Sequence, residues 1–246
     1  MTLAIIGGTG LTTLRGLEIT HREMVRTPYG EPSGPVTHGV LHGRKVMFLA
    51  RHGYNHTIPP HRVNYRANLW ALHHAEASRL LAVAAVGGIS DGFHPGRLAF
   101  PDQIIDYTWG RDHTYFDEDL RQVVHVDFTG PYDPELRRLL LGADVEVGLD
   151  AVPEGTYAAT QGPRLETAAE IRRLARDGCD MVGMTGMPEA VLARELELPY
   201  AACAVVANWA AGLGGREQVA MAEIEQNLRL GMERVRELLG ALIPRL

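Results

Sequence analysis

The chain has 246 residues, of which 22% are charged and 46% hydrophobic, and its formal net charge is −6 at pH 7. This is the composition of a folded globular protein, which excludes wholesale disorder, and the acidic balance argues against a nucleic-acid partner. Apolar runs are too short for a membrane span, no secretory signal precedes the first strand, and two cysteines cannot build a disulfide framework. We therefore expect a cytoplasmic protein with one domain, residues 1–246.

Short apolar runs followed by glycine predict buried strands. In chain order these runs are 3–6, 46–50, 80–86, 181–184 and 201–207, with weaker candidates at 103–107 and 156–159. Helices are predicted at 64–77, 166–177 and 187–195, and an amphipathic stripe predicts a last helix from Met221 to Leu242. Strands that alternate with helices indicate an α/β fold. Ligands of such folds bind beyond the carboxyl ends of the strands.

Two loops at predicted strand ends have the composition of an anion site. In the first, glycines surround Thr9, so that backbone N–H groups and a hydroxyl can face an anion. In the second, Arg51 supplies a planar guanidinium that matches phosphate oxygens, and His52 follows it. Taken alone, the first loop is equally well explained as a structural turn. Taken alone, the second is better explained as a surface arginine beside a packed histidine. Two such loops together favour an anion site.

Three further positions have both a ligand-binding and a structural interpretation. Glu166, placed in the first turn of a helix, can accept a hydrogen bond from a ligand or simply complement the helix dipole. Thr185 precedes a helix and can bind phosphate or cap that helix. Asn208 ends an apolar strand and can contact a ligand through its amide or form a turn.

Metal and serine-hydrolase chemistry have no support in the motifs. The chain has 11 histidines, but none stands in a zinc-protease or Cys/His zinc spacing, and we expect no metal. The Gly-x-Ser-x-Gly sequence of serine hydrolases does not occur.

Taken together and in order, the motifs resemble the trimeric purine nucleoside phosphorylases, and within them the methylthioadenosine and methylthioinosine branch. The resemblance covers nearly the whole chain. The matching segments are 5–10, 49–53, 63–72, 162–164 and Met184-Thr185-x-x-Pro188-Glu189. It implies a single α/β domain with a distorted, partly barrel-like mixed sheet flanked by helices, active as a homotrimer.

The resemblance also implies a reaction and its residues. The family cleaves the bond between a purine and ribose with inorganic phosphate, so phosphate is a co-substrate and no cofactor is needed. The implied phosphate ligands are Thr9, Arg51, His52, Thr185 and the backbone N–H of Ala85, and Met184 would contact the ribose. His52 and Asn208 are the implied catalytic groups. Relatives carry threonine or asparagine at Ala84, so one side-chain contact is absent here.

Two positions predict the base. Relatives that cleave methylthioadenosine carry serine and aspartate where this chain has Glu166 and Asn208. A 6-oxopurine offers N1–H to the Glu166 carboxylate and acceptors to the Asn208 amide, whereas adenine reverses this pattern. Leu165 completes the implied base site. We therefore predict hypoxanthine-type bases.

One position predicts the sugar. Inosine and guanosine phosphorylases place a histidine on the 5′-hydroxyl, and this chain has Met221 there, with Ile224 one turn along. Methionine suits a thioether and gives a hydroxyl no strong partner. His125 of a neighbouring subunit is implied to close this pocket. The resulting hypothesis is phosphorolysis of 5′-methylthioinosine.

Four alternatives stay open. Two lie within the family, namely a methylthioadenosine phosphorylase and an inosine/guanosine phosphorylase. The others are a hydrolytic nucleosidase of similar fold and a non-catalytic nucleoside-binding protein.

Overall fold

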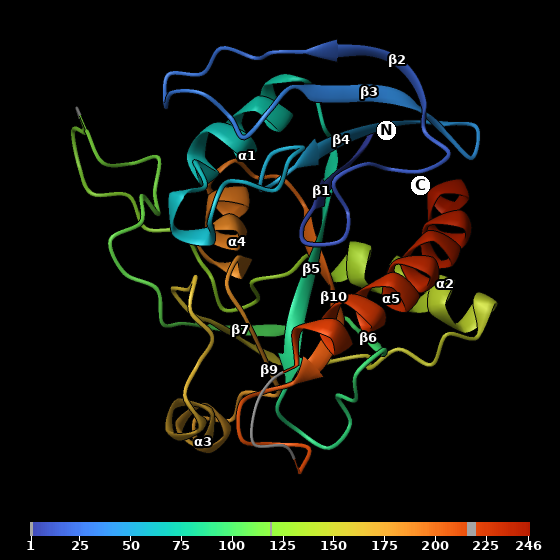
Figure 1. Cartoon of the computed structure of the whole chain (residues 1–246). Coiled ribbons are helices and arrows are strands. Elements are labelled where there is room, and N and C mark those ends of the chain that lie inside the picture. Colours follow the sequence, from blue (N-terminus) through green and yellow to red (C-terminus); the bar gives the residue numbers. More distant parts are fainter. Residues whose placement is uncertain (1, 119, 216–219) are drawn as a thin grey trace.

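A computed structural model describes residues 2–118, 120–215 and 220–246. The described strands form one ten-stranded mixed sheet with helices on both faces (Figure 1). Neighbours across the sheet follow the order β2-β3-β4-β1-β5-β9-β8-β7, and β10 pairs with β5 and β6 off this path. The branching distorts the sheet, and the predicted mixed α/β fold is confirmed. The strands are β1 (Leu3–Gly7), β2 (Glu18–Glu23), β3 (Val36–Leu41), β4 (Arg44–Ala50), β5 (Arg79–Gly88), β6 (Leu98–Ala99), β7 (Gln103–Asp106), β8 (Thr156–Ala159), β9 (Met181–Gly183) and β10 (Tyr200–Trp209).

Four parallel strands, β4, β1, β5 and β10, form the centre of the sheet. Each is a buried apolar run, as expected for strands covered on both faces, and each was predicted from the sequence to within about two residues. Their carboxyl ends lie at one edge. Strand β5 continues past the end of β1 and pairs there with the antiparallel β9, through Gly87 and Val182. The residues that follow β9 are thereby brought to the same edge as the four parallel strand ends.

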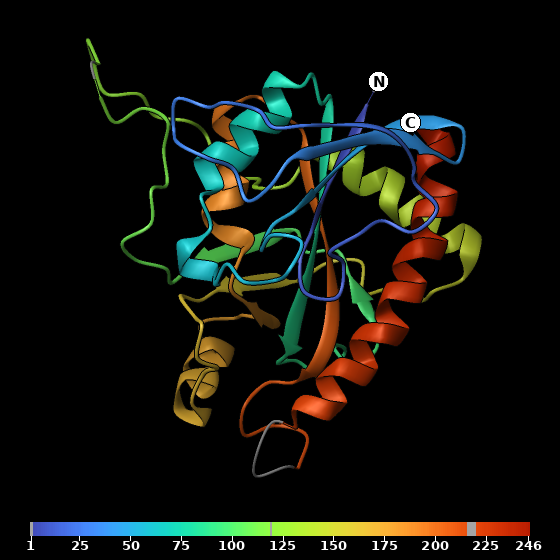
Figure 2. The ribbon, with the colours of Figure 1, turned by 45° about the horizontal axis from the view of Figure 1, so that its top comes forward.

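Two hydrophobic layers enclose the sheet. Helices α2 and α5 cover one face, and α1 and α4 cover the other (Figure 2). The helices are α1 (Tyr65–His74), α2 (Pro134–Val147), α3 (Ala168–Arg176), α4 (Gly186–Glu195) and α5 (Met221–Leu242), with short 3₁₀ turns at Pro60–Arg62 and Ile243–Arg245. The bounds predicted for α5 from its apolar stripe are confirmed.

The structure corrects the starts of three predicted helices, two by their caps and one by its dihedral angles. Asn64 is the N-cap of α1, its side chain accepting from Ala67 N–H. Thr167 is the N-cap of α3, so Glu166 lies before that helix and not in its first turn, and dipole complementation within the helix is the wrong interpretation. Met187 has extended dihedral angles (φ −118°, ψ 139°), so the regular part of α4 begins at Pro188.

Four elements were not predicted. Strands β2 and β6 are exposed or very short, and β3 alternates buried and half-buried residues instead of forming an apolar run. Helix α2 had readable signals, since Asp133 caps its start and Gly148 ends it with φ of 64°. Among the described residues, no helix combines the length and hydrophobicity needed to cross a membrane.

Candidate active site

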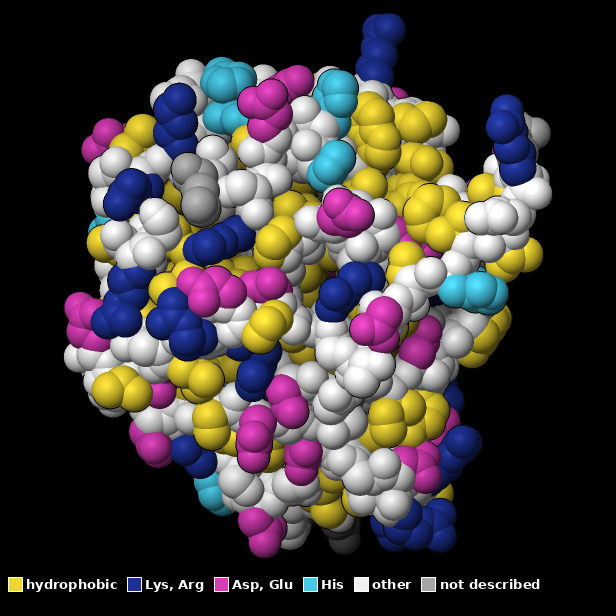
Figure 3. Space-filling model, turned by 180° about the vertical axis from the view of Figure 1, so that it is seen from behind, with side chains coloured by type: hydrophobic (Ala, Val, Ile, Leu, Met, Phe, Trp, Pro, Cys, Tyr) yellow, Lys and Arg dark blue, Asp and Glu magenta, His cyan; other side chains and the backbone are white. Residues whose placement is uncertain are grey.

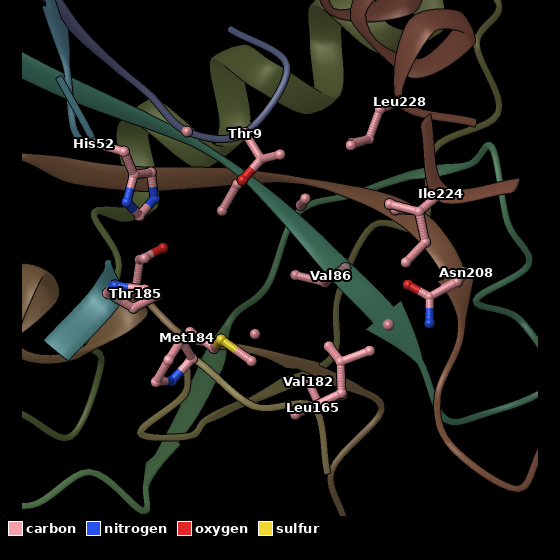
Figure 4. Close-up of a pocket in the computed structure, with 18 of the residues that line it drawn as sticks. Thr9, His52, Val86, Leu165, Val182, Met184, Thr185, Asn208, Ile224 and Leu228 are labelled. Atoms are coloured by element: carbon pink, nitrogen blue, oxygen red, sulfur yellow. The ribbon is translucent and has the colours of Figure 1, made fainter. Parts of the chain in front are cut away.

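The strand ends converge on a cavity of about 490 Å³. Its walls come from the loops after β1, β4, β8, β9 and β10, from the ends of β5 and β10, and from the first turns of α5. Figure 4 shows Thr9, His52 and Thr185 at one end, Asn208 at the opposite end, and Ile224 with Leu228 along a third side. The cavity thus has a polar end, a second end with an amide, and an apolar wall.

The polar end gathers hydroxyl and backbone donors. Thr185 occupies the N-cap position of α4 but makes no side-chain cap bond, so the capping alternative is wrong, and Thr185 lines the cavity. Val83 C=O accepts from Gly8 N–H, and strand alternation points Ala85 N–H to the same side, beyond the end of β1 at Gly7. Thr9 is half-buried, with its hydroxyl 3.4 Å from His56 Nε2. Hydroxyl and amide donors aimed at one point are suited to an oxyanion.

Arg51 is fully buried behind this end. Its Nε and Nη2 donate to the Glu189 carboxylate at 2.7 and 2.9 Å, and its Nη1 donates to Val83 C=O at 3.1 Å. Burial works to lower the pKa of Arg51, but the adjacent Glu189 carboxylate outweighs it, so the net shift is upward. These three bonds leave one N–H on Nη1 and one on Nη2 of Arg51, which can bind a ligand. Gly8 allows this approach, because a Cβ there would stand 2.8 Å from Arg51 Nη1.

His52 presents one ring nitrogen to the cavity (Figure 4). Its Nδ1 lies 2.7 Å from Ile58 C=O, which makes Nδ1 the donor and leaves Nε2 as an acceptor in the neutral ring. Burial, with the Arg51 charge second, lowers the pKa of His52 from 6.5 to about 4. A neutral His52 can accept a hydrogen bond from a protonated phosphate oxygen.

This lowered pKa makes stability depend on pH. The unfolded chain takes up a proton at His52 below about pH 6.5, whereas the folded chain resists protonation down to about pH 4. The stability contribution is therefore complete above pH 6.5 and is lost as the pH falls toward 4. Between pH 7.5 and 5.0 we expect His52 to account for about 2 kcal/mol of lost unfolding free energy. Urea unfolding at both pH values, in phosphate-free buffer, measures this loss. His52→Gln should lose less unfolding free energy than the wild type, by that amount. Equal losses in the two proteins would contradict the lowered pKa of His52.

The opposite end of the cavity holds the residues predicted to contact a base. Glu166 is half-buried, and its Oε1 accepts from the Thr160 hydroxyl at 2.6 Å, which orients the carboxylate. Asn208 is half-buried, and its Nδ2 donates to Trp209 C=O at 2.6 Å, which leaves the second amide N–H and the carbonyl oxygen. Leu165 lines the same end and is 46% exposed. The cavity lining therefore includes a carboxylate acceptor and an amide donor.

The residues predicted to contact the sugar and its 5′ substituent from within the same chain also line the cavity. Met184 lines the cavity between the two ends (Figure 4). Met221, Ile224 and Leu228 come from successive turns of α5, with Met221 62% exposed at the helix start. His125 is exposed on a separate segment and does not line the cavity of its own chain.

Three residues with roles at the site were missed. Glu189 was recognised only as part of a motif, although it holds Arg51. His56 lines the cavity beside His52, with ring centroids 4.8 Å apart. Arg111 is buried and donates to the carbonyl oxygens of Met184 and Met187 at 2.9 and 2.6 Å, which ties the loop after β9 in place. No local pattern marks Arg111, because its partners are distant in sequence.

Comparison with known proteins agrees with this architecture. The chain is similar to a probable S-methyl-5′-thioinosine phosphorylase of Xanthomonas campestris pv. campestris, with 54% identity over 98% of this chain and 96% of the relative. It is similar to a 6-oxopurine nucleoside phosphorylase of Pyrococcus furiosus, with 45% identity over 98% and 92%. Among solved structures, methylthioadenosine phosphorylase from Schistosoma mansoni in complex with adenine superposes with a TM-score of 0.95 and 30% identity, covering 99% of this chain and 91% of that one.

The family model agrees with these relatives. The model described as the Phosphorylase superfamily matches residues 2–244. The match spans all the strand ends that build the cavity, and it confirms the resemblance inferred from the motifs. This chain belongs to the Phosphorylase superfamily.

Proposed function

We propose that the protein catalyses phosphorolysis of S-methyl-5′-thioinosine, releasing hypoxanthine and 5-methylthioribose 1-phosphate. The observation that carries this proposal is a single cavity with three chemically distinct parts. Anion donors lie at one end, a carboxylate and an amide lie at the other, and an apolar wall from α5 runs beside them. The name of the Xanthomonas relative agrees with the same substrate.

The chemistry follows from what each part can stabilise. Breaking the bond between base and sugar leaves a sugar with cationic character and an electron-rich purine. Phosphate held by Thr9, Arg51, His52, Thr185 and Ala85 N–H stabilises the cation and then captures it. At the other end, Glu166 accepts from purine N1–H, and Asn208 donates its remaining amide N–H to the leaving base. Phosphate is the nucleophile, so the proposed reaction uses neither a covalent side-chain intermediate nor a cofactor.

A homotrimer and a cytoplasmic location belong to the same proposal. The segment that carries His125 projects from the body of the molecule (Figure 2). It exposes the apolar side chains of Trp109, by 72%, and Val123, by 73%. We propose that a neighbouring copy covers this surface and receives His125 beside its own α5 wall. Cys179 and Cys203 are buried free thiols, as suits a reducing compartment.

Phosphate dependence tests the reaction class. Purified protein and methylthioinosine should release hypoxanthine only when phosphate is present, with equimolar sugar 1-phosphate formed. Release without phosphate would identify a hydrolytic nucleosidase. Binding of methylthioinosine without any release would identify a nucleoside-binding protein. Either of these outcomes contradicts the proposal.

A second candidate is an inosine/guanosine phosphorylase, favoured by the Pyrococcus relative and by the same carboxylate and amide. Met221, in the apolar wall from α5, distinguishes a methylthioinosine phosphorylase from an inosine/guanosine phosphorylase. Replacing Met221 by histidine supplies a donor for a 5′-hydroxyl, and we expect the ratio of kcat/KM for inosine over methylthioinosine to rise about tenfold. Met221→Leu, which stays apolar, is the matched control. Steady-state assays with both nucleosides measure the ratio, and an unchanged ratio would place the 5′ group elsewhere.

A further inference from the structure

A cluster of metal-ligand side chains lies outside the cavity, on the hairpin formed by β2 and β3. In the register of this antiparallel pair, His21 lies directly opposite His38. Directly opposite residues point to the same face of a sheet, and so does a residue two positions along the same strand. Glu23 therefore joins the two histidines on one face. None of the three lines the cavity.

The geometry of the cluster is close to that of a metal site. One ligand atom from each residue lies within 4.8 Å of the others. His38 Nε2 is 3.3 Å from Glu23 Oε2. With bonds of about 2.0–2.2 Å, two ligands of a tetrahedral zinc ion are about 3.3–3.5 Å apart. The two imidazole rings are stacked, with centroids 4.2 Å apart and an interplanar angle of 8°. A tilt of the exposed His21 ring would aim its ligand nitrogen at the same ion as His38 and Glu23.

The surroundings favour ligation by His38. Its Nε2 is buried and has no hydrogen-bond partner of good geometry among the described residues. The Thr20 hydroxyl lies 3.2 Å from His21 Nδ1. Figure 3 shows histidine and acidic side chains gathered at the top edge of the molecule, where β2 and β3 pass.

We propose that His21, Glu23 and His38 bind one divalent transition-metal ion of the zinc type, with the remaining position filled by water. Two imidazoles and one carboxylate are a common ligand set for such ions, and magnesium and calcium prefer all-oxygen sites. The ion would join the edge strand β2, whose residues are all exposed, to β3. A structural role is therefore expected, with no direct part in phosphorolysis.

This inference departs from the expectation that the chain binds no metal. The motifs of zinc sites place their ligands close together in sequence, and neither His21 nor His38 stands in such a motif. His21 and His38 are joined by a long connection that forms no recognised motif. Only the hairpin register brings them together, so the sequence alone gave no reason to pair them.

Zinc titration of the full-length protein, stripped of metal with a chelator, tests the site. Isothermal titration with zinc chloride is expected to show one ion per chain, and zinc is expected to raise Tm. His21→Gln and Glu23→Gln each change an exposed side chain and should lower zinc affinity at least about tenfold. His73→Gln, at an exposed histidine near the end of α1, is the matched control and should bind as the wild type does.

Cobalt(II) gives a second readout that does not depend on affinity. A site with nitrogen and oxygen ligands in tetrahedral geometry gives visible absorption that either variant should abolish. Unchanged zinc affinity and cobalt spectra in both variants would overturn the proposal. The proposal would also be overturned if phosphate abolished zinc binding while His21→Gln and Glu23→Gln bound zinc as the wild type does. That result would place the ion in the cavity, at His52 and His56. Rates of phosphorolysis should be the same for the wild type and His21→Gln.

Discussion

Replacing Arg51 and Glu189 together by glutamine is expected to lower kcat/KM for phosphate by about 10² to 10³ while the protein stays folded. Both side chains are fully buried and bonded to each other through two N–H···O contacts. Two glutamines keep the volume and a hydrogen bond but remove both charges. The guanidinium N–H groups that face the anion are lost. Initial rates at varied phosphate, with circular dichroism to verify folding, measure the effect.

The single variants separate catalysis from folding. Arg51→Gln alone leaves the Glu189 carboxylate buried without its partner, which is expected to cost about 3–5 kcal/mol of stability. Glu189→Gln alone keeps the guanidinium, so it should retain phosphate binding, and phosphate should raise its Tm more than that of the wild type, because the anion replaces the missing charge. Wild-type kcat/KM for phosphate in the double variant would contradict the assignment of Arg51.

Exchanging Glu166 for serine and Asn208 for aspartate is expected to shift preference from methylthioinosine toward methylthioadenosine by about 10³ to 10⁴. Both residues line the cavity, at the end where we propose that the base binds. A carboxylate at Glu166 meets a lone pair on adenine N1, whereas aspartate at 208 can accept from the adenine amino group. The ratio of kcat/KM for the two nucleosides measures the shift.

A matched variant tests how Glu166 is held. The Thr160 hydroxyl donates to its carboxylate at 2.6 Å. Thr160→Val should lower kcat/KM for methylthioinosine by about three- to tenfold in the wild type. The same change in the doubly exchanged protein should have little effect, because serine has replaced the carboxylate. If base preference stays the same in the exchanged protein, the base is read by other residues.

The central strands and the last helix could be predicted because their signals are local. Buried parallel strands are apolar along their whole length, and α5 carries a long apolar stripe. Strands β2 and β3 depend on pairing with each other and with β4, which leaves little trace in a short window of sequence. Helix α2 could have been predicted from local sequence, because Asp133 and Gly148 are typical residues for the start and end of a helix.

Site residues on strand ends could be predicted for the same reason, since a polar residue after a buried strand must lie at the sheet edge. This reasoning predicts Thr9, Arg51, Thr185 and Asn208, which line one cavity, and the family resemblance supplies their proposed roles. The supporting residues could not be found. Arg111 is defined by contacts with carbonyl oxygens from distant segments, and those contacts exist only in the folded chain.

Competition among three nucleosides tests the proposed substrate most directly. Equal concentrations of methylthioinosine, methylthioadenosine and inosine are incubated with the enzyme and saturating phosphate, and the disappearance of each is followed by chromatography. The proposed function predicts that methylthioinosine is consumed first and that its loss matches the methylthioribose 1-phosphate formed. Faster consumption of methylthioadenosine would contradict the role of Glu166 and Asn208, and faster consumption of inosine would contradict the role of the α5 wall.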